Sequence, residues 1–536
     1  MDVRSIAIVQ LDGSAELIAS APAVLAIRDR HPKSRIHLVT SRRLLEVADL
    51  ISGIDHVAAS GAAAPEKIDL LVNLGFTGES LLAAQRLASP ECIGPRLNQD
   101  SAIILDDGWS RYHEAVVPAG HVNPFHRAEI LASVAGLQWR DPDFALSCRA
   151  EEALGAASRF FSNEPHIKVA VTPGALRYDE CRELVTLLRN SGFRLRFYFL
   201  GILKDRQKIS SLIRELGPDG DCCANLAGEL GLRDTALLSQ GCDVMIAPPG
   251  TEALLSSGFG TLTICPMERD ERSLLDLPFG QGHLCVQAEA EGQSRGGVIA
   301  EAVAHAITAN GGNPPTFSQW RNFFDTRIDE HIGKTRVFLT ARSVVEDVGS
   351  GAKSELRLFP LVFSGANLED SSLLFSRIQW ESVLNEIHVS ERSLEHPQES
   401  TLTALQALAK PLGHLSELAI YGQRSASLVA NHIQNNRPEE ANKEANKLQE
   451  IDELIRSISR SAPILAPISS YFFINQSQIH DVEPMGVAEK MRLCYVLLQH
   501  QAMLMIDLIA KSADPAETGD RRVGERIAGE VTDGQS

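Results

Sequence analysis

Two acidic residues near the start of the chain stand where a carboxylate could do chemistry. The stretch "IAIVQLDGSAELIASAP", from residue 6, contains an apolar run typical of a buried strand, a turn with Asp12, and an apolar helix with Glu16 in its first turn. A carboxylate at such a turn can act as a general base that takes a proton from a hydroxyl group. It can also serve the helix alone, because a negative charge in the first turn stabilises a helix by about 0.3–1 kcal/mol. The sequence leaves both interpretations of Glu16 open.

The elements that would position these residues alternate regularly over the first 315 residues. From residue 1 to about 150, strands such as "RIHLVTS" and "IDLLVNLG" are separated by single helices, and from about 160 to 315 the pattern repeats with "HIKVAVTPG", "RLRFYFLG" and "CDVMIAPPG". Such alternation predicts parallel sheets with helices on both faces. The expected fold class is α/β, with two tandem Rossmann-like domains over residues 1–150 and 160–315. Any ligand is expected in the cleft at the carboxyl ends of their strands.

The last third of the chain has a helical pattern instead. The segments "WRNFFDTRIDEHIGKTRVFLTARSVVEDV" and "AEKMRLCYVLLQHQAMLMIDLIAKSA" have helical spacing. Between them, one apolar helix face is formed by Leu448, Ile451, Leu454, Ile455 and Ile458. This predicts a mainly α-helical domain over residues 316–515, which binds a partner, joins two copies of the chain or packs only on its own core. The tail, residues 516–536, has few large apolar residues and is expected to be disordered.

Composition and charge disfavour several classes of function. The chain has 536 residues and a net charge of −18, which argues against nucleic-acid binding, since phosphate contacts need clustered Lys and Arg. The sequence has no run of about 18 apolar residues and no signal-peptide pattern, so we expect a cytoplasmic protein without a transmembrane segment. The nine cysteines include no CxxC pair, and no His, Cys, Asp or Glu set has metal-ligand spacing. We therefore expect reduced cysteines, no metal and no cofactor.

A series of short signals over about residues 1–310 is similar to a known family. The stretch "IAIVQLDGSAELIASAPAVLAIRDRHPKSRIHLVTSRRLLEVADLISGIDHV", followed by "IDLLVNLG", "CIGPR" and "NPFHRAEILASVAGL", resembles the heptosyltransferase-like glycosyltransferases, which have a two-Rossmann (glycosyltransferase B) fold. The catalytic base of that family is the Asp of a Gly-Asp turn, a place held here by Ala15 and Glu16. Gln10 replaces the family's Arg. The resemblance therefore implies Glu16 as the base, one methylene further out, with Asp12 as the second acidic candidate.

The second half resembles the donor-binding half of the same family. The stretch "VAVTPGALR" implies that Thr172 and Gly174 lie on a strand-to-helix turn, with Arg177 where the family has a Lys. Backbone N–H groups at such a turn and a nearby cation can hold a diphosphate. Asp205, which follows "YFLG", is the implied partner of the donor ribose. The alternative is a structural turn with a surface Arg.

The stretch "APPGTEALLSSGFG" departs from the family, in which many members have Asp-Ser-Gly-Pro-x-His. Gly250, Thr251 and Glu252 are closer to the Gly-Thr-x-Glu-Ala turn of other two-Rossmann sugar transferases. There the Gly and Thr contact the diphosphate and the Glu contacts the ribose. A tight turn lets the backbone approach a pyrophosphate, and an acid at the start of a helix can accept two ribose hydroxyls. A capped helix with Glu252 in its first turn is the alternative.

The predicted function is inverting, metal-independent transfer of a sugar from a nucleotide-diphosphate sugar to a bacterial glycan or protein acceptor, with Glu16 as the base. Two alternatives stay open. One is an inactive scaffold that binds a sugar nucleotide or a protein partner, favoured by the departures from the family's pattern. The other is a sugar-nucleotide epimerase or hydrolase on the same fold. His126, in "NPFHRAEI", is interpreted as a helix-start residue.

Overall fold

The structure is a computed structural model, and its described residues form two compact units. One unit comprises residues 1–117 and 123–365, and the other comprises residues 118–122 and 366–536. The described residues are 3–62, 67–119, 123–137, 146–161, 166–172, 174–267, 275–278, 280, 283–288, 295–310, 335–344, 356–362, 380, 384, 399–481 and 483–513. In the first unit we call residues 3–117 and 123–137 the first half and residues 146–362 the second half.

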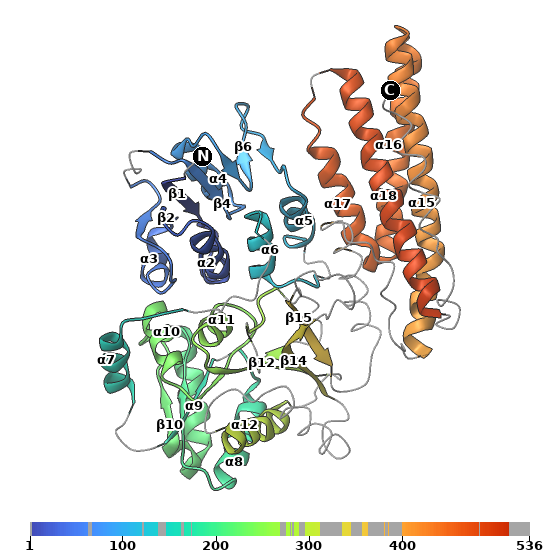
Figure 1. The fold of residues 1–536 in the computed structure, drawn as a ribbon. Helices are drawn as coiled ribbons and strands as arrows, with labels where there is room; N and C mark the ends of the chain where they lie inside the picture. Colours follow the sequence, from blue (N-terminus) through green and yellow to red (C-terminus); the bar gives the residue numbers. More distant parts are fainter. Residues whose placement is uncertain are drawn as a thin grey trace. The chain divides into compact units, whose positions relative to one another are not determined.

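The first half is built on a parallel sheet of five strands in the order β3-β2-β1-β4-β5 (Figure 1). The central strand β1 is apolar and its last four residues are fully buried, as its sequence predicts. The strands are β1 (Ser5–Val9), β2 (Arg35–Thr40), β3 (His56–Ala59), β4 (Leu70–Asn73) and β5 (Cys92–Ile93), with a separate hairpin of β6 (Arg96–Leu97) and β7 (Ile103–Ile104). The helices are α1 (Ser14–Ala19), α2 (Ala21–Arg30), α3 (Leu45–Ala48), α4 (Gly78–Leu87), α5 (Gly108–Val116) and α6 (Arg127–Val134).

The second half repeats this design and extends it. Its sheet has eight strands in the order β10-β9-β8-β11-β12-β13-β14-β15, and the pairs from β10 to β13 are parallel. The strands are β8 (Ile167–Val171), β9 (Leu195–Phe199), β10 (Cys223–Asn225), β11 (Val244–Ile246), β12 (Leu262–Met267), β13 (Leu284–Ala288), β14 (Thr335–Val344) and β15 (Leu356–Val362). The helices are α7 (Ala150–Phe160), α8 (Tyr178–Asn190), α9 (Arg206–Glu215), α10 (Leu232–Gln240), α11 (Thr251–Gly258) and α12 (Gly296–Asn310). The two-Rossmann α/β fold expected from the sequence is confirmed.

Helices cover both faces of the second sheet, and the strand residues alternate accordingly. Val169 and Val171 of β8 pack in a cluster with residues of α8, α9 and α12. Ala170, between them, packs in a second cluster with residues of α10 and α11. Because neighbouring strand residues point to opposite faces, a strand buried on both faces must be apolar throughout. This explains the unbroken apolar runs in the sequence.

The prediction of helix for residues 335–344 was wrong. The segment "TRVFLTARSV" forms β14, which pairs antiparallel with both β13 and β15. Its β-branched and aromatic residues favour an extended chain, and pairing with two neighbours stabilises that choice over the weak helical spacing. The second sheet therefore continues to residue 362, past the expected boundary at 315. Helix α7 (Ala150–Phe160) covers the interval between the two expected domain bounds at residues 150 and 160.

Both sheets share one feature that decides where a ligand can lie. Numbered within each half, the first five strands have the order 3-2-1-4-5, so the winding of the chain reverses between β1 and β4 and again between β8 and β11. Loops that leave the carboxyl ends of such strands diverge to opposite faces of the sheet and form a crevice between them. The predicted residues Asp12, Thr172 and Gly250 all follow strands at these two switch points.

The second unit is helical where the structure describes it, as predicted for this region. In Figure 1 the long helices α15 (Glu399–Gln434), α16 (Pro438–Ser461) and α18 (Pro484–Ala513) run alongside one another, with the shorter α17 (Ala466–Ser477). Of the predicted helix face, Ile451 and Ile455 are buried in the shared core, whereas Leu454 is exposed. The predicted disordered tail lies outside the described residues.

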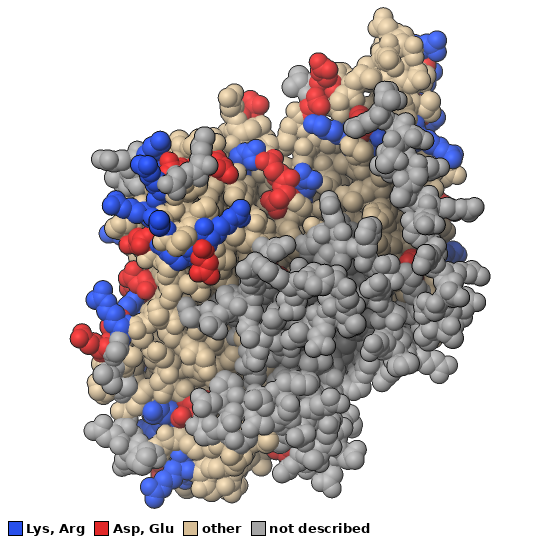
Figure 2. Space-filling view, in the orientation of Figure 1, with Lys and Arg blue, Asp and Glu red and all other residues tan. Residues whose placement is uncertain are grey.

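One helix of this unit has the length and hydropathy of a membrane span. It is α18, over Pro484–Ala510, and 44% of its most apolar window is buried. The buried side chains include Tyr495, Leu498 and Ala502, which belong to the core of the helical unit. On the face shown in Figure 2, basic and acidic residues of the described surface intermix. All nine cysteines are free thiols, and six of them are buried.

Candidate functional site

Asp12 is fully engaged at the switch point of the first sheet. Its carboxylate accepts hydrogen bonds from the backbone N–H groups of Phe76 (2.7 Å) and Thr77 (3.2 Å). It also accepts hydrogen bonds from the hydroxyls of Thr77 and Ser80, both at 2.7 Å. These donors lie at the amino end of α4, which is the place where a helix would otherwise bind an anionic ligand. Asp12 therefore fills the anion position of the first half with a side chain of the protein itself.

Gln10 connects the loops that follow β1 and β4. Its side chain is fully buried, its Oε1 accepts a hydrogen bond from the Asp12 N–H (3.0 Å), and its Nε2 donates to the Leu74 carbonyl (2.9 Å). Both ends of the amide are thus satisfied inside the protein. Where the resembling family has an Arg, this chain has a neutral structural bridge between the loops that follow β1 and β4.

Glu16 lies in the first turn of α1 and folds back over Gly13. A Cβ atom added to Gly13 would lie 2.3 Å from Glu16 Oε2, so only glycine leaves room for the carboxylate in this position. The other oxygen, Oε1, is ion-paired at 2.9 Å with Nη1 of Arg127. The side chain of Glu16 is 25% exposed, whereas that of Arg127 is 8% exposed. The carboxylate is therefore held by Arg127 at Oε1, and the side chain as a whole keeps partial exposure.

Arg127 is shared between the two halves of the unit. Besides Glu16, its guanidinium binds the Asp276 carboxylate in a fork, with Nε donating to Oδ1 at 2.6 Å and Nη2 to Oδ2 at 2.8 Å. Its backbone N–H donates to the Leu275 carbonyl at 2.8 Å. Burial lowers the pKa of Arg127, but the carboxylates of Asp276, Glu16 and Asp12 outweigh burial and raise it. The guanidinium therefore carries its charge at any working pH.

His126 is the N-cap residue of α6, in agreement with its interpretation as a helix-start residue. Its Nδ1 accepts a hydrogen bond from the Ala128 N–H (3.1 Å), and its Nε2 lies 3.0 Å from the Leu277 carbonyl. These two contacts fit a neutral ring with its proton on Nε2. Burial lowers the pKa of His126 to about 4, against smaller upward effects of the Leu277 hydrogen bond and of Asp276. His126 and Arg127 together bind three consecutive residues of the second half, Leu275 to Leu277.

The switch point of the second sheet carries unused polar groups. Thr172 follows β8 and is 8% exposed, and its Oγ1 has no hydrogen-bond partner among the described residues. Gly250, the N-cap residue of α11, has φ 136°, in a region that side-chain-bearing residues rarely adopt. Within the part of the chain that the structure describes, the carboxylate of Glu252 makes no hydrogen bond or ion pair. Gly174, also at positive φ, lies in the turn after Thr172 with open space beside it.

Two of the predicted donor residues have local partners instead. Arg177 is the N-cap residue of α8, and its guanidinium pairs with Asp179 at 3.0 Å and with Glu180 at 3.5 Å. Asp205 accepts a hydrogen bond from the Ile202 N–H (3.1 Å) in the short 3₁₀ turn before α9. The positive charge of Arg177 is thus balanced by acids of its own helix.

The first turns of α1 and α11 meet across the two halves. The hydroxyls of Ser14 and Thr251 are hydrogen-bonded at 2.7 Å, and the Gly250 N–H donates to the carbonyl of Asp276 at 2.9 Å. The structure therefore joins Glu16 to the turn at Gly250 through Arg127 and Asp276. Sequence reasoning missed Ser14, Arg127 and Asp276 because their partners lie far away along the chain.

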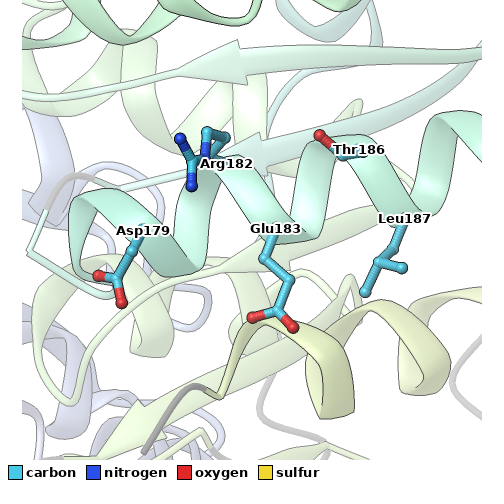
Figure 3. A pocket seen from close by; sticks show the side chains of 5 residues that line it. All are labelled: Asp179, Arg182, Glu183, Thr186 and Leu187. Atoms are coloured by element: carbon cyan, nitrogen blue, oxygen red, sulfur yellow. The ribbon is translucent and has the colours of Figure 1, made fainter. Parts of the chain in front are cut away.

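A surface pocket of about 380 Å³ lies elsewhere, along the outer face of α8. Figure 3 shows its lining side chains on successive turns of this one helix: Asp179, Arg182, Glu183, Thr186 and Leu187. None of the predicted site residues lines it, and we do not place a donor site there. Among the described residues, no three His, Cys, Asp or Glu side chains gather as a metal site would require.

Comparison with known proteins gives a likeness of fold. No protein-family model and no curated protein matches the sequence. The structure is similar to ADP-heptose lipopolysaccharide heptosyltransferase II of E. coli, with a TM-score of 0.43 and 13% identity, over 56% of this chain and 97% of that one. A family 9 glycosyl transferase of Veillonella parvula matches with a TM-score of 0.43 and 13% identity, over 61% and 97%. A UDP-glucosyltransferase of Polygonum tinctorium matches with a TM-score of 0.33 and 12% identity, over 58% and 91%. At these identities and TM-scores the likeness describes the path of the chain and assigns no reaction to it.

Proposed function

We propose that this chain is a glycosyltransferase that takes a sugar from a nucleotide-diphosphate sugar bound at the second switch point, with Glu16 as the base. The observation that carries the proposal is the hydrogen bond between Ser14 and Thr251. It brings the helix that bears the candidate base against the helix that begins at the candidate donor turn. Transfer requires this proximity, because the acceptor hydroxyl must meet both the base and the sugar carbon.

The donor site is assembled from the loops after β8 and β11. Backbone N–H groups at the start of α11 and the hydroxyl of Thr172 supply hydrogen bonds to the diphosphate, because anions are stabilised at helix N-termini. The positive φ of Gly250 keeps a side chain out of the way of the phosphates. The Glu252 carboxylate accepts hydrogen bonds from the ribose hydroxyls. Thr172 and Glu252 thus gain partners that none of the described residues gives their side-chain oxygens.

Glu16 has the geometry of a base that is held in place. With Oε1 bound to Arg127, Oε2 is the atom that takes the acceptor proton. Inverting transfer asks the protein for a base, alignment and stabilisation of the leaving diphosphate, and α11 and Thr172 provide the last of these without a metal. Asp12 positions α4 and takes no proton, since all its acceptor capacity is used within the first half. The acceptor is a glycan or a protein, and the reaction is cytoplasmic.

The proposal is tested by calorimetric titration of the full chain with a panel of UDP-, ADP-, GDP-, CDP- and dTDP-sugars. We expect at least one donor to bind, and its nucleoside diphosphate to bind as well. Failure of every nucleotide to bind would overturn the proposal. Product that forms without any acceptor would identify a hydrolase or an epimerase on the same fold.

A second candidate function is a scaffold that binds the nucleotide without turnover. Its supporting observation is that both acids of the first loop are engaged, Asp12 on α4 and Glu16 on Arg127. Tight binding of a sugar nucleotide, with no loss of the sugar in the presence of cell-derived glycans and proteins, would favour this function.

A further inference from the structure

We infer that Arg127 is a positioning residue that aligns the base with the donor turn. The inference rests on the proposed function and deepens it. Arg127 touches neither substrate in this scheme. It binds Glu16, the proposed base, and Asp276, which contacts the donor turn. One guanidinium therefore fixes the positions of the base and of the donor turn relative to each other.

All three nitrogens of the Arg127 guanidinium contact a carboxylate. Nη1 binds Glu16, while Nε and Nη2 bind the two oxygens of Asp276 in a planar fork at 2.6 and 2.8 Å. Arg has five N–H donors in a rigid plane, which lets one side chain hold two carboxylates at a set angle. A Lys ammonium in the same place is a point charge that cannot form the fork. The site is therefore specific for Arg and not only for positive charge.

Asp276 connects Arg127 to the proposed donor turn. Asp276, held by Arg127, accepts the hydrogen bond of the Gly250 N–H through its own carbonyl. Gly250 is the N-cap residue of α11, where the proposal places the diphosphate. A shift of Arg127 would therefore move the base and the donor turn together. Misplacement of reacting groups by about 1 Å can lower a rate about 100-fold.

The charges of Arg127, Glu16 and Asp276 are partly buried, so an imbalance among them is poorly screened by water. Arg127 and Asp276 have side chains that are 8% and 20% exposed. One cation faces two carboxylates, so removal of the cation leaves two like charges close together with little water to screen them. Glu16 would then turn away from Asp276, and away from the position in which it faces the acceptor. The expected defect is one of alignment, distinct from loss of the donor site.

A matched control lies on the same interface. Arg233 of α10 also joins the two halves, donating from Nη1 to the carbonyl of Glu46 (2.6 Å) and from Nη2 to Glu152 (2.8 Å). It contacts neither Glu16 nor the turn at Gly250. Substitution of Arg233 measures the effect of a weaker interface alone. Substitution of Arg127 measures the effect of a weaker interface together with the loss of alignment between base and donor turn.

The experiment compares Arg127→Met, Arg127→Lys, Asp276→Asn and Arg233→Met in the full chain, with the donor that binds wild type most tightly. For Arg127→Met we expect kcat to fall about 100-fold while the nucleotide Kd rises no more than about tenfold. Arg127→Lys restores part of kcat, and Asp276→Asn lowers kcat and weakens binding. Arg233→Met lowers the thermal midpoint and leaves kcat within about twofold of wild type.

Two results would overturn the inference and leave the proposed function standing. One is a kcat of Arg127→Met equal to that of wild type. The other is an equal loss of kcat in Arg233→Met, which would reduce Arg127 to a structural contact.

If Arg127→Met does not fold, Arg127→Lys and Asp276→Asn decide, and wild-type kcat in both overturns the inference. A wild type that binds no nucleotide overturns the proposed function along with the inference.

Discussion

Ser14 and Thr251 are 237 positions apart in the sequence, and their hydroxyl oxygens lie 2.7 Å apart in the structure. Each is the first residue of its helix, α1 or α11, so two helix N-termini with partial positive charge meet here. Arg127, the first residue of α6, adds a full positive charge. The carboxylates of Glu16 and Asp276 both pair with Arg127 and balance this positive potential. A diphosphate at this place is therefore held by the backbone N–H groups at the start of α11, as proposed, and not by an excess of positive side chains.

Replacing Glu16 by Gln tests the base. The amide keeps the size and can still accept a hydrogen bond from Arg127, but it cannot take a proton. We expect transfer to fall by about 10²- to 10⁴-fold, the usual contribution of a general base, with an unchanged nucleotide Kd. Turnover and calorimetry on the same preparation measure both quantities. Full turnover by this variant would remove Glu16 from the mechanism.

Replacing Thr172 by Val separates stability from binding. No residue in the described part of the chain bonds to this buried hydroxyl, so its removal should leave the thermal midpoint unchanged or raise it slightly. In the complex the same hydroxyl meets the diphosphate, and a hydrogen bond to a charged group contributes about 1.5–3 kcal/mol. We expect the nucleotide Kd to rise about 10- to 100-fold. A destabilised variant that binds nucleotide normally would contradict this assignment.

Replacing Gly250 by Ala tests the donor turn. The residue has φ 136° and open space around it, so an alanine there is opposed by backbone strain and not by a clash. Such strain costs of the order of 1–3 kcal/mol. We expect a lower thermal midpoint together with weaker nucleotide binding, because relief of the strain re-aims the first N–H groups of α11. Unchanged binding would show that this turn does not hold the diphosphate.

His126 makes the stability of the first unit sensitive to pH. Its pKa in the folded protein, about 4, is below its ordinary value of 6.5, so the folded state binds fewer protons than the unfolded state between these values. This contribution is complete above pH 6.5 and is lost as the pH falls toward 4, at about 1.4 kcal/mol per pH unit at most. His126→Asn keeps an N-cap oxygen but does not titrate. We expect it to be less stable than wild type at pH 7 and to lose less stability on acidification.

Urea unfolding at pH 7, 6 and 5 measures this difference. His113, whose pKa burial lowers to about 3, is present in both proteins and cancels in the comparison. Stability curves of wild type and His126→Asn that run parallel from pH 7 to 5 would mean that His126 is not buried as a neutral ring.

Two glycines of α15 provide a paired test of the helical unit. A Cβ atom on Gly422 would lie 2.4 Å from the ring of Tyr495 on α18, whereas one on Gly413 meets no atom within 4 Å. Gly→Ala in an open helix position stabilises by about 0.5–1 kcal/mol, and overpacking of a core destabilises by about 1–3 kcal/mol. We expect Gly413→Ala to raise the thermal midpoint of this unit and Gly422→Ala to lower it. Equal effects would contradict the described packing of α15 on α18.

Much of the fold follows from local pattern. The apolar runs, their spacing by single helices and the glycines at the turns identify two parallel sheets, because strands covered on both faces cannot be built otherwise. The positions of Glu16 and Gly250 in first helical turns are equally local. For β14 the local pattern misleads, since antiparallel pairing with β13 and β15 decides its conformation and neither partner is visible in its own sequence.

The site itself depends on contacts that span the chain. Nothing near Asp12 in the sequence indicates that α4 consumes its carboxylate, because Phe76 and Ser80 are more than 60 residues away. Arg127 belongs to a motif that resembles the family, but its contact with the second half is made through Asp276, 149 positions further along the chain. Arg177 was chosen for its charge, and its neighbours on α8 neutralise that charge.

The most direct measurement is calorimetric titration of the tightest-binding nucleotide into wild type, Glu252→Gln and Glu16→Gln. If the second switch point holds the donor and Glu16 serves only the transfer step, Glu252→Gln weakens binding at least about tenfold, as expected for loss of a charged hydrogen-bond acceptor. Glu16→Gln then binds like wild type. Equal binding by wild type and Glu252→Gln, or no binding of any nucleotide to wild type, would contradict the account.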